Sequence, residues 1–446
     1  MKRQVLLGLV GGLLVSGWSG PAFAAKDKVD ILLEKLVQKG ILTSEEAGSI
    51  RQEVVQTEAE ASQPNLAATD EAHTKALAKA ILPKWVQDWT WSGDIRLREE
   101  SRNGTGSGSN VNLQRIRFRL GADAKVSDNL RVGARLATGS GTDPISTNQS
   151  FNTSFNRASF LLDRAYVAYT PEVPGLDQVK LTGGIIENPF WTVSEVQWDE
   201  DLNFDGAAAH AHTDLGPVNV FVNGGVFSLQ TALTEAASLW SIQGGGVIRP
   251  FPDSDAEALN NVTVKGALAY HDYKNVTNPF SENNAFALAG GSSTTTPAAP
   301  TATQLKGNTA GVQDFNLLNI AFQVASTIDW LPCKLWWEWV HNTAVAQGNN
   351  GFQVGLGMGK AKTPFDLKEG WEAGYYFERL EPDATFGPFA GSDFGASGTN
   401  HRGNVWWVKL AMLKNSQVGL KYYSAQEVKQ PKSHEDRLQV DWVTKF

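Results

Sequence analysis

Arginine side chains recur at regular spacing in three segments near the start of this 446-residue sequence. Within each segment the spacing is two or four residues, so the arginines share one face of an extended strand. Where three such strands are neighbours, these side chains form a basic wall, and like charges at that density need compensation from water, counter-ions or carboxylates. The residues are Arg96, Arg98, Arg115, Arg117, Arg119, Arg131 and Arg135.

A second charged group of the opposite sign lies in the segment 187–203. Its acidic residues are Glu187, Glu195, Asp199, Glu200 and Asp201. We hypothesise that this segment folds against the arginines and supplies the compensating charge. In the alternative, the arginines pair only with carboxylates on their own strands, such as Asp94 and Asp123, and the acidic segment stays away from them.

Other residue types that carry chemistry do not form convincing sites. His210 and His212 share one strand face, but two ligands without a convergent third make a poor metal site. The glycine-rich stretch 355–359 lacks the phosphate-loop pattern. Scattered Ser, His and Asp residues do not suggest a catalytic triad. We therefore expect no catalytic residue, no metal and no cofactor.

The first 24 residues are typical of a cleaved secretory signal. Lys2 and Arg3 precede an apolar run from about Val5 to Trp18, and small residues follow up to Ala22-Phe23-Ala24. The run is too short to cross about 30 Å of hydrocarbon, so an export signal at 1–24 is favoured over a membrane anchor.

Composition excludes several classes of protein. The net charge of −8 and the pI near 5.5 argue against nucleic acid as a partner. The single Cys333 rules out an intramolecular disulfide framework. After residue 25 no stretch approaches 18 consecutive apolar residues, which excludes helical membrane spans.

The segment 25–82 has a helical pattern. Val29, Leu32, Leu33 and Leu36 recur at three-to-four spacing, and Gly40 follows where a helix would end. Thr43 and Glu46 form a capping box for a second helix, and a third ends before Pro83. We predict a short α-helical segment in the periplasm. A solvated linker, a coiled coil and a docking element remain as alternatives.

From residue 83 to residue 446 the period changes to two. In 115–125, Ile116, Phe118 and Leu120 lie on one face, and arginines lie on the other. About sixteen such runs follow, most of them roughly the 9–11 residues that a tilted membrane strand requires. They are 89–100, 111–126, 129–138, 159–170, 178–186, 204–213, 217–228, 239–250, 261–272, 313–328, 333–343, 350–361, 370–381, 403–413, 416–427 and 436–446. Small residues weaken the pattern at 204–213 and 350–361.

The connections and the final strand carry independent signals. Tight turns around 127–129, 214–216, 329–332 and 414–415 alternate with longer segments rich in Gly, Ser, Thr and Asn, which is the layout of bacterial outer-membrane barrels. With an even number of strands, the first strand begins and the last strand ends on the short-turn side of the barrel. The last strand ends in Phe446 and shares a face with Trp442, which resembles the C-terminal signature read by the barrel-assembly machinery.

These signals together predict an all-β transmembrane antiparallel β-barrel of about sixteen strands, in contact with outer-membrane lipid. The arginines must then face the lumen, because each arginine facing lipid at mid-depth costs about 2–4 kcal/mol. A barrel of about sixteen strands is wide enough to enclose water. An acidic segment folded inside would narrow that space, and the field across it would orient polar solutes.

Nearly the full length of the chain resembles bacterial porins that carry an N-terminal helical segment. The matching pieces are 36–47, Ser92–Arg98, Arg115–Ala124, Leu162–Val167, Asn188–Phe190 and Trp198–Asn203. The resemblance implies a passive channel for small hydrophilic solutes or ions. A homotrimer is expected by analogy with other sixteen-stranded porins.

Two other functions stay open at this point. The barrel could sheathe a partner protein, such as a cytochrome in an electron conduit. The chain could also be a soluble secreted β-protein, for example a hydrolase.

Overall fold

The computed structural model describes most of the chain after residue 88 and a few positions before it. The ranges are 89–104, 110–141, 143–151, 157–230, 237–274, 306–309, 314–395, 397–429 and 433–446, with positions 155, 276 and 312 and scattered positions between 33 and 50. The chain divides into two compact units, 1–83 and 84–446. In the described ranges no helix is long and apolar enough to span a membrane.

In the first unit, the described positions lie in two helical turns. Lys39 N donates to Lys35 O over 3.1 Å, and Ala47 N donates to Thr43 O over 3.0 Å. The second bond agrees with a helix that begins after Thr43. The predicted export signal at 1–24, the third helix and a coiled coil lie outside the described residues.

The second unit consists almost entirely of strands. They are β1 (Trp89–Gly104), β2 (Val111–Lys125), β3 (Leu130–Thr138), β4 (Gln149–Ser150), β5 (Phe160–Tyr169), β6 (Gln178–Glu187), β7 (Asn203–Leu215), β8 (Val218–Gln230), β9 (Ala237–Ile248), β10 (Thr263–Lys274), β11 (Phe315–Ile328), β12 (Leu331–Asn342), β13 (Asn350–Ala361), β14 (Gly370–Leu380), β15 (His401–Leu413), β16 (Ser416–Glu427) and β17 (His434–Lys445). Among the described residues of this unit, two short helices accompany them, α6 (Glu257–Asn260) and η2 (Gly387–Phe389).

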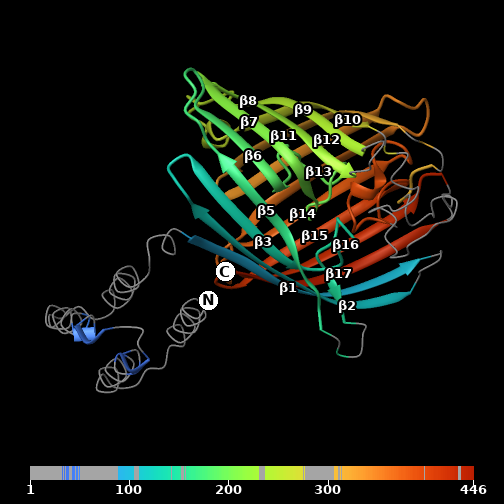
Figure 1. Cartoon of the computed structure of the whole chain (residues 1–446). Coiled ribbons are helices and arrows are strands. Elements are labelled where there is room, and N and C mark those ends of the chain that lie inside the picture. Colours follow the sequence, from blue (N-terminus) through green and yellow to red (C-terminus); the bar gives the residue numbers. More distant parts are fainter. Residues whose placement is uncertain are drawn as a thin grey trace. The chain divides into compact units, whose positions relative to one another are not determined.

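The strands form one closed antiparallel barrel. β1 pairs with β2 on one side and with β17 on the other, so the sheet has no free edge (Figure 1). Of the 17 strands, β4 has only two residues and extends the ladder of β3 beside β2, which leaves sixteen strands in the wall. The predicted barrel of about sixteen strands is confirmed. The prediction missed β4, because two residues are too short to show an alternation.

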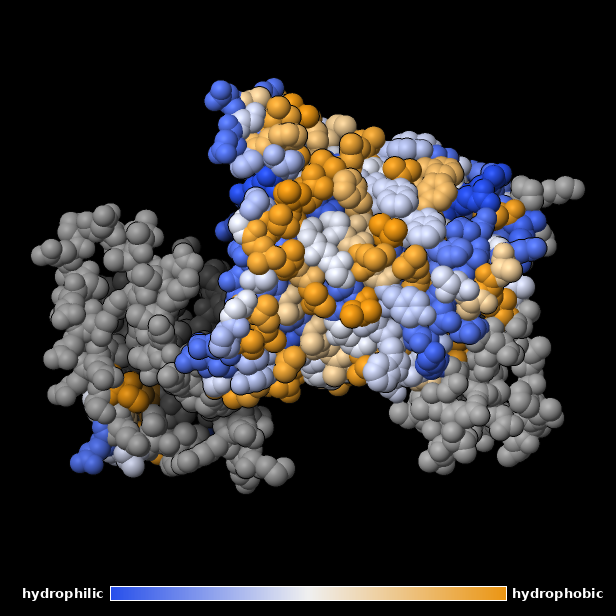
Figure 2. Space-filling view, turned by 90° about the horizontal axis from the view of Figure 1, so that it is seen from above, coloured by the Kyte–Doolittle hydropathy of each residue, from blue (hydrophilic) through white to orange (hydrophobic). Residues whose placement is uncertain are grey.

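Alternation along each strand separates a lipid face from an inner face. On β1, Ile95 and Leu97 are 37% and 49% exposed, whereas Arg96 and Arg98 are 7% and 6% exposed. Figure 2 shows one outer face, where apolar residues spread over the middle and hydrophilic residues gather toward its ends. An apolar band between polar ends fits a wall that crosses a bilayer.

Tight turns connect the strands at one end of the barrel. Residues at three of these turns, Asp329, Asn415 and Gly216, have positive φ angles of 56°, 60° and 67°, as two-residue hairpins require. The opposite end carries the connections 139–159, 188–202, 275–314 and 381–400. The predicted sorting is not strict, because the connection 249–262, which contains α6, lies at the short-turn end.

A large apolar cluster lies inside the barrel. Phe190 and Trp198 of loop 188–202 and Phe386 of loop 381–400 pack with inward-facing residues such as Phe227 and Tyr273. Two of the loops therefore fold back into the barrel and bury aromatic side chains there.

Candidate functional site

Five of the seven predicted arginines lie together on the inner faces of β1 and β2. The register places Arg96 opposite Arg117 and Arg98 opposite Arg115, and Arg119 follows on the same face of β2. Arg117 is 6% exposed, which is close to the values of Arg96 and Arg98. The strands thus hold these five guanidinium groups side by side, turned away from the lipid face.

Carboxylates are interleaved with these arginines. Asp94 on β1 accepts hydrogen bonds from Arg117 Nε at 3.0 Å and Arg119 Nε at 2.6 Å. Asp441 on β17 accepts two bonds from Arg98, at 2.7 and 2.8 Å. This bidentate pair crosses the seam where the last strand meets the first, and it fixes both partners in one geometry.

A second group of charges surrounds Arg98 on its other side. Asp393 of loop 381–400 lies 3.0 Å from Arg98 and 3.5 Å from Arg437, and Glu100 lies 3.8 Å from Arg98. Burial alone would raise the pKa of Asp393, but Arg98 and Arg437 outweigh it and hold that pKa well below its usual value. The predicted basic wall is therefore a mixed network of arginines and carboxylates.

The other two arginines lie apart from this network. Arg135 on β3 pairs with Asp163 on β5. Arg131 is exposed and lies opposite Lys125, beside the short turn 126–129. The spacing along the chain groups them with the other five, whereas the structure does not.

Two acids of the loop 188–202 reach the arginines. Glu200 Oε1 lies 3.5 Å from Arg117 Nη1 and 3.8 Å from Arg96 Nη1. Asp201 Oδ1 lies 3.2 Å from Arg119 Nη1, and its other oxygen accepts from Thr147. Burial alone would raise the pKa of Asp201, but Arg117, Arg119 and Arg96 lower it below its usual value. Asp201 therefore stays ionised against the arginines.

The same loop contacts the other side of the barrel. Glu338 on β12 accepts hydrogen bonds from Val193 N at 3.2 Å, Ser194 N at 2.9 Å and Ser194 Oγ at 2.8 Å. Closer to the start of the loop, Trp191 N donates a hydrogen bond to Gln243 on β9 over 2.9 Å. Five strands, β13 to β17, separate β12 from β1 around the wall. The loop therefore crosses the inside of the barrel from β9 and β12 to β1 and β2.

The sequence of the barrel matches that of a known protein family. A family model described as "Putative porin" matches residues 105–329 and 313–446, which together cover well over half of the chain. This chain belongs to that porin family. Family and fold together make it an outer-membrane porin.

Solved structures of similar fold include one from Pseudomonas putida and one from Salmonella typhi. A high-pH structure of OprB from Pseudomonas putida shares 12% identity with a TM-score of 0.51, over 84% of this chain and 96% of that chain. OmpF of Salmonella typhi in complex with daunomycin has 9% identity and a TM-score of 0.44, over 80% and 97%. At this identity the likeness to OprB shows the fold alone. A comparison with curated proteins gave no match.

Of the five acidic residues in segment 187–203 that were expected to compensate the arginines, three do not face the arginine network. Glu187 pairs with Arg164 on β5 at 3.1 Å. Glu195 O accepts from Gly391 N over 3.0 Å, and Asp199 Oδ2 accepts from Ser392 N over 2.7 Å, so both fasten the loop 188–202 to the loop 381–400. Burial raises the pKa of Asp199 to about 8, and it raises the pKa of Glu195 well above its usual value.

The C-terminal residues of the porin lie on its outer wall. Phe446 exchanges two backbone hydrogen bonds with Gly93, at 2.8 and 3.0 Å, and its ring lies 6.2 Å from that of Phe118. Trp442 and Phe446 are 45% and 55% exposed. The last strand therefore presents both aromatic rings outward beside the closing seam. Their role as an assembly signal stays a prediction.

Sequence reasoning missed several members of the charged network in the porin. Asp441 lies on the polar face of the last strand, and closure of the barrel would have placed that face beside β1. Arg437 lies on the same face. Asp393 carries no signal of this kind, because it belongs to a loop whose path the alternation does not predict. In the described part of the chain, no group of three or more His, Cys, Asp or Glu residues is arranged to hold a metal ion.

Proposed function

We propose that this porin forms a water-filled channel for passive diffusion of small hydrophilic solutes and ions. In this proposal the path is narrowed between the arginines of β1 and β2 and the loop 188–202. The observation that carries it is the 3.5 Å contact between Arg117 and Glu200. The Glu200 side chain is 64% exposed although its partner is buried, so this charge pair borders water inside the barrel.

The physical basis is electrostatic. A wall of sixteen strands encloses more space than side chains alone fill. Fixed charges of both signs across a narrow path set up a local field, and they favour polar solutes over apolar ones. Arginines remain charged at every relevant pH, so the basic side of such a path does not titrate.

A structural sheath for a partner protein is the weaker alternative. The loop residues that bond to Gln243 and Glu338 occupy space that a second protein threaded through the barrel would need. This favours a path for small solutes.

Planar bilayers give the test of channel function. Purified protein added to one side is expected to produce discrete current steps in KCl, and vesicles containing it are expected to swell in small sugars up to a size limit. Heat-denatured protein is the control. Protein that inserts into the membrane and gives no current in repeated experiments contradicts the proposal.

The assembly and the N-terminal segment belong to the same proposal. We expect a homotrimer in the outer membrane, by analogy with other sixteen-stranded porins, and an N-terminal helical segment in the periplasm after removal of residues 1–24. Chemical cross-linking in outer-membrane vesicles tests the first expectation, and N-terminal sequencing of the mature chain tests the cleavage after Ala24.

A further inference from the structure

A pocket that is open on one side lies on the inner wall, away from the arginines. It has a volume of about 340 Å³, which is within the range of small-molecule sites. Inner-face residues of β7 to β10 and the start of the loop 188–202 surround it. These residues are Pro189, Phe190, Trp191, His210, His212, Asn219, Phe221, Asn223, Val247 and Lys265. We call this space the lysine pocket.

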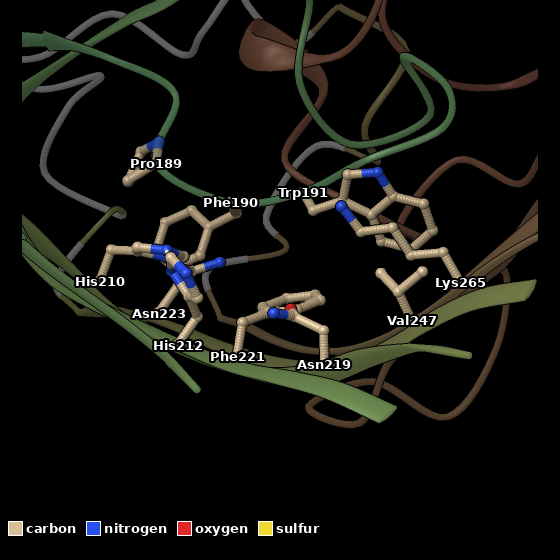
Figure 3. Close-up of a pocket in the computed structure, with 10 residues that line it drawn as sticks. All are labelled: Pro189, Phe190, Trp191, His210, His212, Asn219, Phe221, Asn223, Val247 and Lys265. Atoms are coloured by element: carbon tan, nitrogen blue, oxygen red, sulfur yellow. Dashed lines mark hydrogen bonds between the residues drawn. The ribbon is translucent and has the colours of Figure 1, made fainter. Parts of the chain in front are cut away.

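The arrangement around the lysine pocket places different chemistry at its two ends. In Figure 3, Phe190 and Trp191 lie on one side and Phe221 and Asn219 lie on the other. His210 and His212 stand at one end and Lys265 stands at the opposite end. A molecule in this space would therefore meet apolar surfaces along its length and polar groups at its ends.

The charge of the lysine pocket is one-sided. Lys265 Nζ lies 4.6 Å from the centre of the Trp191 ring and 5.1 Å from that of Phe221. In the described part of the chain, the ten lining residues include no Asp or Glu. Aromatic rings stabilise an ammonium group but do not neutralise it. The pocket therefore offers a half-buried cation without a carboxylate among its walls.

A chain of hydrogen bonds holds these walls in place. The Trp191 main chain exchanges two bonds with Gln243, at 2.9 and 2.8 Å, and Asn223 Nδ2 donates to Gln243 Oε1 over 2.8 Å. Asn223 Oδ1 then accepts from His210 Nδ1 at 2.6 Å, and His210 Nε2 lies 3.4 Å from His212 Nδ1. One network of hydrogen bonds thus joins the loop to the histidine end and holds the walls of the pocket in place.

We propose that the lysine pocket is a binding subsite for small aromatic carboxylates. The carboxylate pairs with Lys265, the ring lies between the apolar side chains of the loop and of the strands, and the far end of the molecule faces the imidazole of His212. The proposal rests on the proposed channel function in one respect. Solutes reach this subsite through the lumen. The subsite then concentrates flat anions there relative to neutral solutes.

Binding to the purified porin in detergent tests the subsite without requiring current. The probe is 4-fluorobenzoate, followed by fluorine NMR. The comparison probes are 4-fluorobenzyl alcohol, which has the ring without the charge, and 4,4,4-trifluorobutyrate, which has the charge without the ring. We expect saturable binding of 4-fluorobenzoate, and binding of the two comparison probes at least about tenfold weaker, because each lacks one of the two interactions.

Matched variants assign the binding to this pocket. Lys265→Gln is expected to weaken 4-fluorobenzoate about tenfold or more. The control is Lys334→Gln, because Lys334 Nζ also lies over a ring, 5.6 Å from the centre of Trp336, but does not line the pocket. His212→Gln provides a second variant if Lys265→Gln lowers the yield of folded barrel, and weaker binding is expected there too.

Three results overturn the subsite. They are no saturable binding of 4-fluorobenzoate, equal binding of the alcohol, and equal effects of the Lys265 and Lys334 variants. Binding without channel current would contradict the proposed function and leave the subsite in place. Channel current without binding of 4-fluorobenzoate would contradict the subsite and leave the proposed function in place.

Discussion

Arg117 Nη1 and Glu200 Oε1 lie 3.5 Å apart, although 83 residues separate them in the chain. The Arg117 side chain is 7% exposed and the Glu200 side chain is 64% exposed. The loop thus brings an accessible carboxylate to a buried guanidinium group. Because the carboxylate is accessible, its charge can be removed with little effect on the packing around it, which makes Glu200 the better probe of the two.

The seam between β1 and β17 should contribute to stability through Arg98 and Asp441. Asp441→Asn removes a bidentate partner from an arginine that is 4% exposed in its side chain. We expect the free energy of unfolding to fall by about 1.5–3 kcal/mol, because the amide can accept only one of the two hydrogen bonds and the buried Arg98 loses the charge of this partner. Urea unfolding of the protein in lipid vesicles measures it.

The control for the seam is Lys409→Gln. Lys409 and Glu372 also pair across neighbouring strands, at 3.2 Å, but both are more exposed. Exposed pairs contribute about 0–1 kcal/mol. Equal losses in the two variants would contradict the role assigned to the seam.

Glu338 should act as the anchor that holds the loop 188–202 across the barrel. Glu338→Gln replaces one acceptor oxygen with an amide that cannot accept from Val193 N or Ser194 N. We expect the loop to loosen, with larger and noisier single-channel current. Glu372→Gln, a change of the same chemistry on β14, should leave the current unchanged. A smaller or unaltered current in Glu338→Gln would count against the anchor.

The contact between the two inner loops should depend on pH through Asp199. Its pKa of about 8 in the folded protein lies above its ordinary value of 3.8, so the folded state binds this proton more tightly than the unfolded state. The stabilisation is therefore complete below about pH 4, and it is lost progressively as the pH rises to about 8. We expect channel current to become noisier over this range.

Asp199→Asn should weaken this pH dependence, because the Asp199 side chain no longer ionises and only Glu195, whose pKa is also raised, remains to titrate at the contact. Glu200→Gln should keep the profile, since Glu200 lies on the arginine side of the loop. A wild-type profile that does not change between pH 4 and pH 9 would show that Asp199 does not control the contact.

Phe446 should matter for assembly more than for the folded barrel. Phe446→Ala keeps the backbone bonds to Gly93 and removes only the ring. We expect less heat-modifiable barrel in the outer membrane, measured by electrophoresis with and without boiling. Trp406→Ala is the control, because Trp406 is an outward ring with a similar exposure of 44%. Equal yields of the two variants would reject the assembly role.

The wall of this protein was predictable because lipid and lumen impose opposite requirements on neighbouring residues. Every strand except β4 carries that contrast, which is why Ile116 and Arg117 could be assigned to opposite faces. The pattern is weakest in β7, where Ala and Gly occupy both faces. In β13 the glycines lie on the inner face, opposite Val354, Leu356 and Met358 on the outer face, and both strands are present.

The inner site was predictable only in part. Alternation placed five arginines on the inner faces of the first two strands, but the pairing of Arg96 with Arg117 depends on hydrogen-bond register, which alternation alone does not determine. Charge placed acids in the loop 188–202. Their partners depend on the path of that loop, which the burial of Phe190 and Trp198 and the bonds to Glu338 determine. Such long-range contacts leave no local pattern.

The reversal potential of single channels in a KCl gradient tests the central claim most directly. Glu200→Gln removes one negative charge beside Arg96 and Arg117, so the reversal potential is predicted to shift toward anion preference. Glu187→Gln is the matched control, because Glu187 has a side chain 73% exposed and pairs with Arg164, outside this group. A shift in Glu200→Gln alone supports a path between the arginines and the loop. No shift, or the same shift in both variants, contradicts it.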